Sequence, residues 1–175
     1  MALAANLYNY YIIDPSDGSV HRTSNIHHDD DIYNYTLNPK LQGLSNVCAA
    51  NLENYYVIKN GKEVMRTSNM DHNSDPYSYT LDPACQDGDY YFAADLENYY
   101  IVYGAHVHRT SNMDHNSDPY DYSLHPTFVN FMPFTDCSGE WVNLISGPYD
   151  ATTTVKFGVS KTLSESFSST SSTSV

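Results

Sequence analysis

A threefold internal repeat is the feature that most limits what this chain can fold into. The segment Asn9–Ile13 returns as Asn54–Ile58 and again as Asn98–Val102, with a period of 45 and then 44 residues. Two further motifs, Arg-Thr-Ser-Asn and Tyr-x-Tyr-x-Leu, follow it in the same order in every copy. Because copies with a fixed period fold into similar units, the chain is expected to contain three equivalent structural repeats.

Each repeat divides into four short extended segments. In the second repeat these segments cover residues 54–59, 63–69, 77–82 and 89–94. Asn60-Gly61 predicts a two-residue hairpin turn, since both residue types accept positive φ. The Tyr-x-Tyr-x-Leu segments alternate as a strand with one buried face must. A proline follows each of these segments, and it is expected to end the strand because it has no N–H for a ladder.

Four strands in each of three repeats predict an all-β protein, with a β-trefoil over residues 1–134. A β-prism is the alternative, and a propeller is disfavoured because three blades are fewer than propellers normally use. After Phe134 the repeat stops. Residues 135–150 are expected to form a linker or closing segment, and the Ser/Thr-rich residues 151–175 a short extended C-terminal tail.

Composition narrows the range of ligands. The chain has 17 tyrosines, a formal net charge of −13 and only eight lysines and arginines. A nucleic-acid ligand is not expected, because a basic surface is needed to neutralise phosphates. The same deficit disfavours docking on anionic lipid head groups, whereas neutral ligands such as sugars fit this charge. The three cysteines occupy non-equivalent positions and predict neither a disulfide framework nor a metal site.

The N-terminal sequence predicts no signal peptide, since it has no basic region followed by a long apolar stretch. No segment is expected to span a membrane as a helix. These features predict a cytoplasmic protein, one exported without a leader, or one whose leader has already been removed.

The loop between the second and third strands of each repeat is the most informative stretch. Residues 66–77 are identical to residues 109–120 at all twelve positions, and residues 22–33 form a first copy of the same length with a changed middle. Loops usually diverge, so one explanation is three equivalent binding sites. Recent duplication is a second explanation, and a structural role in pinning the hairpin is a third.

Asp, Asn and His beside Tyr rings are side chains typical of a site for a neutral sugar, with the polar groups bonding the hydroxyls and a ring stacking on the pyranose. The candidate ligand-binding residues are Asn25, His28, Asp31, Tyr33, Asn69, Asp71, His72, Asp75, Tyr77, Asn112, Asp114, His115, Asp118 and Tyr120. Three linked weak sites would gain avidity for glycans on cell surfaces or glycoproteins. Since His27 stands where the other copies have Asp71 and Asp114, the first site is expected to differ.

Metal binding, cofactor binding and catalysis are not expected. Asp71-x-Asn73-x-Asp75 starts like an EF-hand loop, but Pro76 and Asp82 stand where that loop needs Gly and Glu. One His plus carboxylates in each loop is too few for zinc. The HExxH, P-loop, GxSxG and Rossmann motifs are absent, so the chain is not expected to be an enzyme.

Two stretches resemble known families. The run Asn54–Asn69 is somewhat similar to the repeats of monocot mannose-binding lectins, which are β-prisms, but the glutamine and aspartate of their sugar site are missing. The segment Thr154–Thr170 resembles the start of an aerolysin-type pore-forming module, in which Ser/Thr-rich strands flank a membrane-inserting hairpin. Several members of that family carry an N-terminal lectin domain, sometimes a β-trefoil. The QxW motif of ricin-type trefoils is absent here.

The resemblance to aerolysin-type proteins implies that this chain is the receptor-binding part of a larger pore-forming protein, which would meet the membrane only through a missing C-terminal module. Two other functions stay open. A β-trefoil protease inhibitor would insert one exposed loop into a protease, although three alike loops count against it. A storage or structural protein without a ligand would also accommodate Tyr-rich repeats.

Overall fold

The computed structural model describes residues 2–126, and these residues are all-β with twelve strands. Each sheet takes four consecutive strands. The first contains β1 (Ala2–Asn6), β2 (Asn9–Asp14), β3 (Ser19–Thr23) and β4 (Tyr33–Thr36). The second contains β5 (Asn46–Asn51), β6 (Asn54–Lys59), β7 (Glu63–Thr67) and β8 (Tyr77–Thr80). The third contains β9 (Tyr90–Asp95), β10 (Asn98–Tyr103), β11 (His106–Thr110) and β12 (Tyr120–Ser123).

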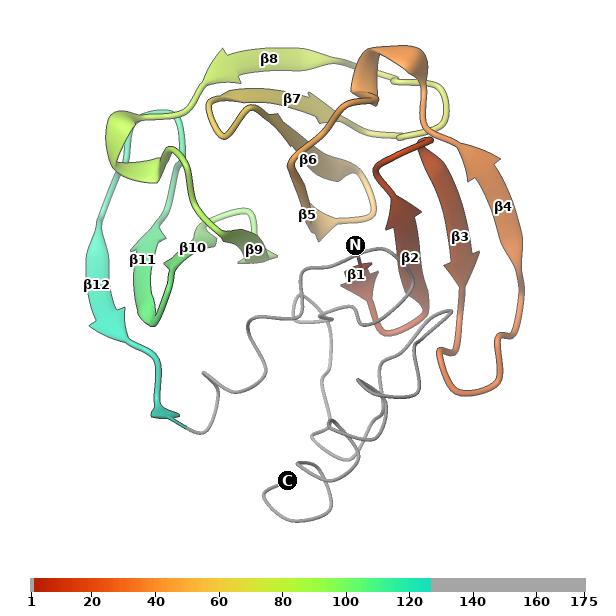
Figure 1. Ribbon diagram of the computed structural model, residues 1–175, viewed down its shortest axis with the longest axis horizontal. Helices are drawn as coiled ribbons and strands as arrows, with labels where there is room; N and C mark the ends of the chain where they lie inside the picture. Colours follow the sequence, from red (N-terminus) through yellow and green to blue (C-terminus); the bar gives the residue numbers. More distant parts are fainter. Residues whose placement is uncertain (1, 127–175) are drawn as a thin grey trace.

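The three sheets form an arc around a common centre (Figure 1). Every sheet is an antiparallel meander, in which each strand pairs with the next one along the chain. The first strand of each sheet lies nearest the centre and the last lies outermost, so the sheets radiate outward (Figure 1). Strand β5 contacts both β1 and β9, which holds the inner ends of the sheets together.

Local signals explain the turns. Asn60 and Gly61 have φ of 53° and 67°, and the N–H of Lys62 donates to the carbonyl of Lys59 at 3.0 Å, as predicted for a two-residue hairpin. The prolines predicted to end strands also begin the short 3-10 turns η1 (Pro39–Leu41) and η2 (Pro83–Cys85). These turns carry the chain from the outer strand of one sheet to the inner strand of the next (Figure 1).

The prediction of an all-β chain with four strands per repeat is confirmed for the described residues. The β-trefoil itself is not confirmed. A trefoil closes its strands into a barrel, which needs ladders between different repeats, whereas the ladders in residues 2–126 stay within one sheet. The fourth segment predicted for the second repeat, β9, begins the third sheet. It pairs with β10, to which it is joined by a tight turn, whereas a long connection separates it from β8.

The β-prism agrees with the structure in its count of four-stranded sheets. Its sheets are the sides of a prism, however, whereas these sheets radiate from a centre (Figure 1). The predicted linker over residues 135–150 and the tail over residues 151–175 lie outside the described residues.

Apolar layers between neighbouring sheets form the core. We call the side of a sheet that faces the following sheet its forward face, and the opposite side its backward face. Between the first two sheets, Ile13 and Leu37 pack with Val57 and Met70. The equivalent layer between the second and third sheets contains Ile58, Leu81, Ile101 and Met113. Since the residues of both layers are buried, the two junctions are the main hydrophobic contacts of the described chain.

Two cysteines lie in this core. Cys48 and Cys85 are free thiols and both are buried. Burial raises the pKa of each thiol to about 12, so both stay protonated at neutral pH. These two side chains therefore serve as small apolar groups in the junction between the second and third sheets.

Candidate functional site

The arginine that begins each repeated loop fastens the loop to the adjacent hairpin. Arg66 donates from Nε to Asn54 Oδ1 at 2.9 Å, from Nη1 to the carbonyl of Asp75 at 3.0 Å, and from Nη2 to the carbonyl of Glu53 at 2.7 Å. Arg22 and Arg109 make the equivalent bonds in the other sheets. The planar guanidinium suits this task because its donors are fixed in a fork.

The loop asparagines and one set of loop aspartates also shape the backbone. Asn69 Oδ1 accepts the N–H groups of Asp71 and His72 at 2.8 and 3.1 Å. Asp75 has a φ of 47°, and its carboxylate accepts the hydroxyl of Ser68 at 3.1 Å. The same bonds recur around Asn25, Asp31, Asn112 and Asp118. The arginine, the asparagine and the last aspartate of each loop therefore hold the backbone of the loop in place. This is the structural role that the sequence left open.

Two pockets lie at the junctions between neighbouring sheets. The pocket between the second and third sheets has a volume of about 470 Å³, and the pocket between the first and second about 380 Å³. Both volumes fall in the usual range for sites that bind small molecules. Each pocket combines Tyr and Arg side chains of one sheet with a Leu, a Tyr and the loop residues of the next. The two pockets are therefore equivalent positions in the repeat.

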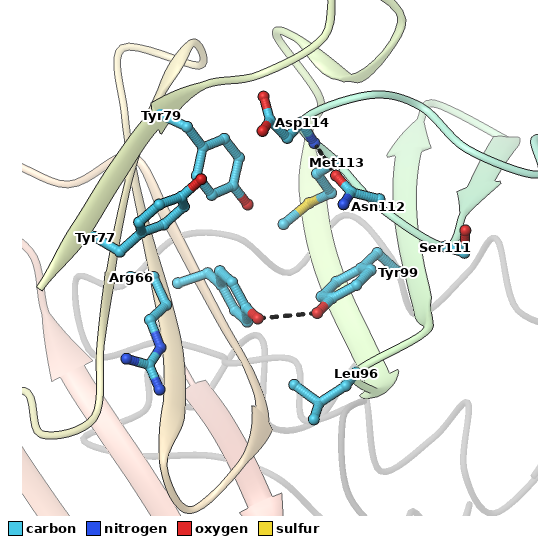
Figure 2. Close-up of a pocket in the computed structure, with 10 residues that line it drawn as sticks. Arg66, Tyr77, Tyr79, Leu96, Tyr99, Ser111, Asn112, Met113 and Asp114 are labelled. Atoms are coloured by element: carbon cyan, nitrogen blue, oxygen red, sulfur yellow. Dashed lines mark hydrogen bonds between the residues drawn. The ribbon is translucent and has the colours of Figure 1, made fainter. Parts of the chain in front are cut away.

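A pair of tyrosines lines each pocket. The hydroxyls of Tyr56 and Tyr99 are 2.9 Å apart across one junction, and their rings meet edge to face at 84° (Figure 2). Tyr11 and Tyr55 repeat this arrangement across the other junction, with hydroxyls 3.0 Å apart. Burial raises the pKa of the Tyr55, Tyr56 and Tyr99 hydroxyls, so these groups stay protonated and able to donate.

The walls of the pocket between the second and third sheets differ in chemistry. Tyr77 is 58% exposed, and its ring lies 5.7 Å from that of Tyr79. Asp114 and Leu96 come from the third sheet, on the other side of the pocket (Figure 2). Among the described residues the Tyr77 hydroxyl has no hydrogen-bond partner, so it remains available to a ligand.

The pocket between the first and second sheets has one extra internal bond. Tyr33 donates its hydroxyl to Asp71 Oδ2 at 3.1 Å, across the junction. This hydrogen bond to a carboxylate raises the pKa of Tyr33. His72 also lines this pocket, with Nε2 3.6 Å from Asp71 Oδ2.

The structure divides the predicted site residues between the two pockets and the rest of the surface. One pocket is lined by Tyr33, Asn69, Asp71 and His72, and the other by Tyr77, Asn112 and Asp114. The remaining candidates, which line neither pocket, are Asn25, His28, Asp31, Asp75, His115, Asp118 and Tyr120. The sequence placed one site in each loop, whereas each pocket takes its tyrosine from one loop and its aspartate from the next.

Sequence reasoning missed the residues that line the pockets from the strands. Tyr11, Arg22, Tyr35 and Tyr55 line one pocket, and Tyr56, Arg66, Tyr79 and Tyr99 the other. The sequence did contain a signal for these residues, since the motifs Asn-Tyr-Tyr and Tyr-x-Tyr recur in every repeat. Buried strand positions need only an apolar residue, so a repeated hydroxyl on those rings pointed to a polar role.

Three comparisons bear on the identity of the chain. Searches against protein-family models, curated proteins and solved structures find no match. In the part of the chain that the structure describes, no helix is long and apolar enough to cross a membrane. No group of three or more His, Cys, Asp or Glu side chains within residues 2–126 is placed to hold a metal ion.

Proposed function

We propose that this chain is a carbohydrate-binding protein, not an enzyme, and that its ligands are neutral sugars held in the pockets between neighbouring sheets. One observation carries the proposal. The same combination of an exposed tyrosine ring, a partly buried aspartate and an exposed leucine stands at two equivalent junctions of one chain. Repetition of a solvent-open polar pocket supports binding, since packing alone does not require it.

The chemistry of the pocket fits a polyhydroxylated ligand. The Asp114 carboxylate accepts hydrogen bonds from hydroxyls, and Tyr77 supplies both a hydroxyl and a ring face for stacking. Leu96 is 49% exposed and offers an apolar surface on the opposite wall. The net charge of −13, together with a carboxylate in each pocket, disfavours anionic ligands.

Two pockets in one chain also suit a receptor that carries several sugars. Single shallow sites bind weakly, on the order of 4 kcal/mol at millimolar affinity. Linked sites raise the overall affinity without any new contact, provided that the receptor reaches both. We therefore expect much tighter binding to a multivalent glycan surface than to a free monosaccharide.

The test is a glycan-array screen of the full chain, followed by calorimetry with the best ligand. Asp71→Asn and Asp114→Asn each remove one carboxylate at nearly unchanged size, and each should weaken one site per chain. The double variant should lose at least about tenfold in affinity on the array, because hydrogen bonds to charged groups are the strong ones. Asp30→Asn, a change in the first loop at a residue that lines neither pocket, is the matched control.

The outcomes separate the alternatives. Specific binding that both single variants reduce and the control preserves supports sugar sites at the junctions. Binding that survives the double variant would keep a lectin but move its sites elsewhere. Folded protein that binds no glycan would overturn the proposal, and protease inhibition would then be assayed.

We also propose that the three sheets are blades of a β-propeller. Four-stranded antiparallel meanders, radiating from a centre with the first strand innermost, support this assignment (Figure 1). Propellers commonly have four to eight blades, so the three described sheets would form part of such a ring.

Delivery of a pore-forming module is a separate proposal. It rests on the likeness of Thr154–Thr170 to aerolysin-type proteins, and these residues lie outside the part that the structure describes. In this proposal the sugar pockets would attach the larger protein to cell-surface glycans. Attachment of this chain to erythrocytes, with competition by the array ligand and without lysis, is the expected result.

A further inference from the structure

A partly buried tyrosine of the outer strand, Tyr35 or Tyr79, lines each pocket. Tyr79 lies on the forward face of the second sheet and Tyr35 on the forward face of the first. Neither hydroxyl has a hydrogen-bond partner among the described residues, and that of Tyr79 points into the space between two sheets (Figure 2). Burial raises the pKa of both phenols, so each keeps its proton and stays a donor. A partly desolvated donor without an acceptor costs free energy, which a ligand that accepts its bond would recover.

The tyrosine pair of each pocket adds a second donor. The hydroxyls of Tyr56 and Tyr99 lie 2.9 Å apart, and because one of them donates to the other, the accepting hydroxyl keeps a proton of its own. In the part of the chain that the structure describes, no other atom accepts that proton. Tyr79 is near enough to this pair to act electrostatically on Tyr99. Two unused phenolic donors therefore face the same space, and the same arrangement recurs beside Tyr35 in the other pocket.

The loop of the following sheet supplies an acceptor and an apolar group side by side. Asp114 brings a partly buried carboxylate, and Met113, the residue before it, is 2% exposed. The Met113 side chain points into the space between Tyr79 and Tyr99 (Figure 2). The same places in the pocket between the first and second sheets are taken by Met70 and Asp71. Each pocket therefore combines two donors with one carboxylate and one thioether.

An acetamido group matches this set of side chains. Its carbonyl oxygen has two lone pairs and no proton, so it can accept from both unused phenols. Its N–H needs an acceptor, which the Asp114 carboxylate provides. Its methyl group needs an apolar wall, which Met113 provides. A sugar hydroxyl fits less well, because it brings a further proton to a place where donors already outnumber acceptors.

We propose that the pockets select sugars that carry an acetamido group, such as 2-acetamido-2-deoxyhexoses, over the parent hexoses. This inference rests on the proposed sugar-binding function and adds the class of sugar. Such sugars are neutral, which suits a chain with a net charge of −13. The preference should be larger in the pocket of Asp114, because in the other pocket Tyr33 already donates to Asp71 at 3.1 Å.

The experiment is an NMR titration of the full chain, carrying ring-labelled tyrosine, with four methyl glycosides. The probes are those of N-acetylglucosamine and N-acetylgalactosamine, and those of their parents glucose and galactose. The acetylated sugars should bind at least about tenfold more tightly than their parents, which is the net effect of about one added hydrogen bond. Their binding should also shift the ring resonances of the pocket tyrosines.

Two variants test the part played by the unused donors. Tyr79→Phe and Tyr35→Phe each remove one hydroxyl, and each should remove most of the preference for acetylated sugars at one pocket while changing the affinity for the parent hexoses much less. Both should keep the thermal stability of wild type, since these hydroxyls bond to no described protein atom. Tyr122→Phe makes the same change at the equivalent position of β12, which lines neither pocket, and is the matched control.

The outcomes separate this inference from the sugar-binding proposal. Equal affinity for acetylated and parent sugars, or array binding confined to glycans without an acetamido group, would overturn the inference and leave sugar binding in place. A preference that survives both Tyr→Phe changes would overturn it too, because the acetamido group would then be recognised elsewhere. A folded chain that binds none of the four probes would also count against it, and the glycan array would decide separately whether the chain binds sugars at all.

Discussion

The loops 66–77 and 109–120 have the same sequence but lie in different surroundings. In the third sheet, Asn116 Oδ1 is 2.6 Å from His108 Nε2, whereas the equivalent Asn73 Oδ1 is buried without a hydrogen-bond partner among the described residues. Asp71 accepts a hydrogen bond from Tyr33, and no such bond joins Asp114 to Tyr77. Identical loops thus acquire different properties from the strand before them and from the neighbouring sheet.

This difference has a simple physical cause. The part of the loop that binds its own hairpin repeats perfectly, since its partners are in the same repeat. The part that faces a junction depends on residues of another repeat, which have diverged. The loop residues that bond to their own hairpin should therefore contribute equally to stability in the two repeats. The loop residues that face a junction should make different contacts with a ligand.

The largest expected effect tests whether the arginines of the two identical loops contribute equally to stability. Arg66→Ala and Arg109→Ala should each lower the free energy of unfolding by about 3 kcal/mol, because each removes several hydrogen bonds from a charged, partly buried group. Urea unfolding at one protein concentration measures the loss. Arg66→Lys and Arg109→Lys keep the charge but lose the fork, and should recover less than half of it.

Losses that differ strongly between the two positions would contradict a shared structural role. Such a result would mean that Arg66, which lines a pocket, contributes through its neighbours in the third sheet as well.

The second prediction concerns the hydrogen-bond partner that Asn116 has and Asn73 lacks. Met65 stands where the first and third sheets have His21 and His108, and it offers no donor to Asn73. Met65→His should raise the free energy of unfolding by about 1–2 kcal/mol, since a buried unsatisfied acceptor gains a partner. His108→Met should lower it by at least a similar amount, because Asn116 then keeps only its weak contact with the Cys85 thiol and Asp121 loses its bond to the imidazole.

Thermal unfolding of both variants checks this prediction. Met65→Leu keeps the apolar volume without a donor and is the control, expected to change stability little. A gain from Met65→Leu equal to that from Met65→His would show that packing, rather than the hydrogen bond, limits the second sheet.

Local features of the fold were predictable, and contacts between repeats were not. Asn60-Gly61 and the prolines at 39 and 83 act through their own φ preferences, so their turns follow from sequence. The sheet that β9 joins depends instead on competition between a tight turn after it and a long connection before it. The pockets depend on which faces of the sheets meet, and a single sequence does not show that. Only the repeated tyrosine pairs, such as Tyr56 with Tyr99, carried a sign of those contacts.

The smallest expected effect concerns the bond that distinguishes the two pockets. The Asp71 carboxylate stabilises the protonated hydroxyl of Tyr33 by a hydrogen bond, and its negative charge opposes a second one, so the pKa of Tyr33 is raised. Asp71→Asn removes that charge, and the pKa of Tyr33 should therefore fall toward its ordinary value. NMR titration of ring-labelled tyrosine measures this shift, with Tyr33→Phe identifying the resonance.

Asp114→Asn is the matched control, since it makes the same change in the other pocket and should leave the titration of Tyr33 unaltered. If Tyr33 titrates identically in wild type and Asp71→Asn, the cross-junction hydrogen bond does not persist in solution. The two pockets would then differ only through His72 and the strand residues around them. Asp71 and Asp114 would then be expected to contribute alike to ligand affinity.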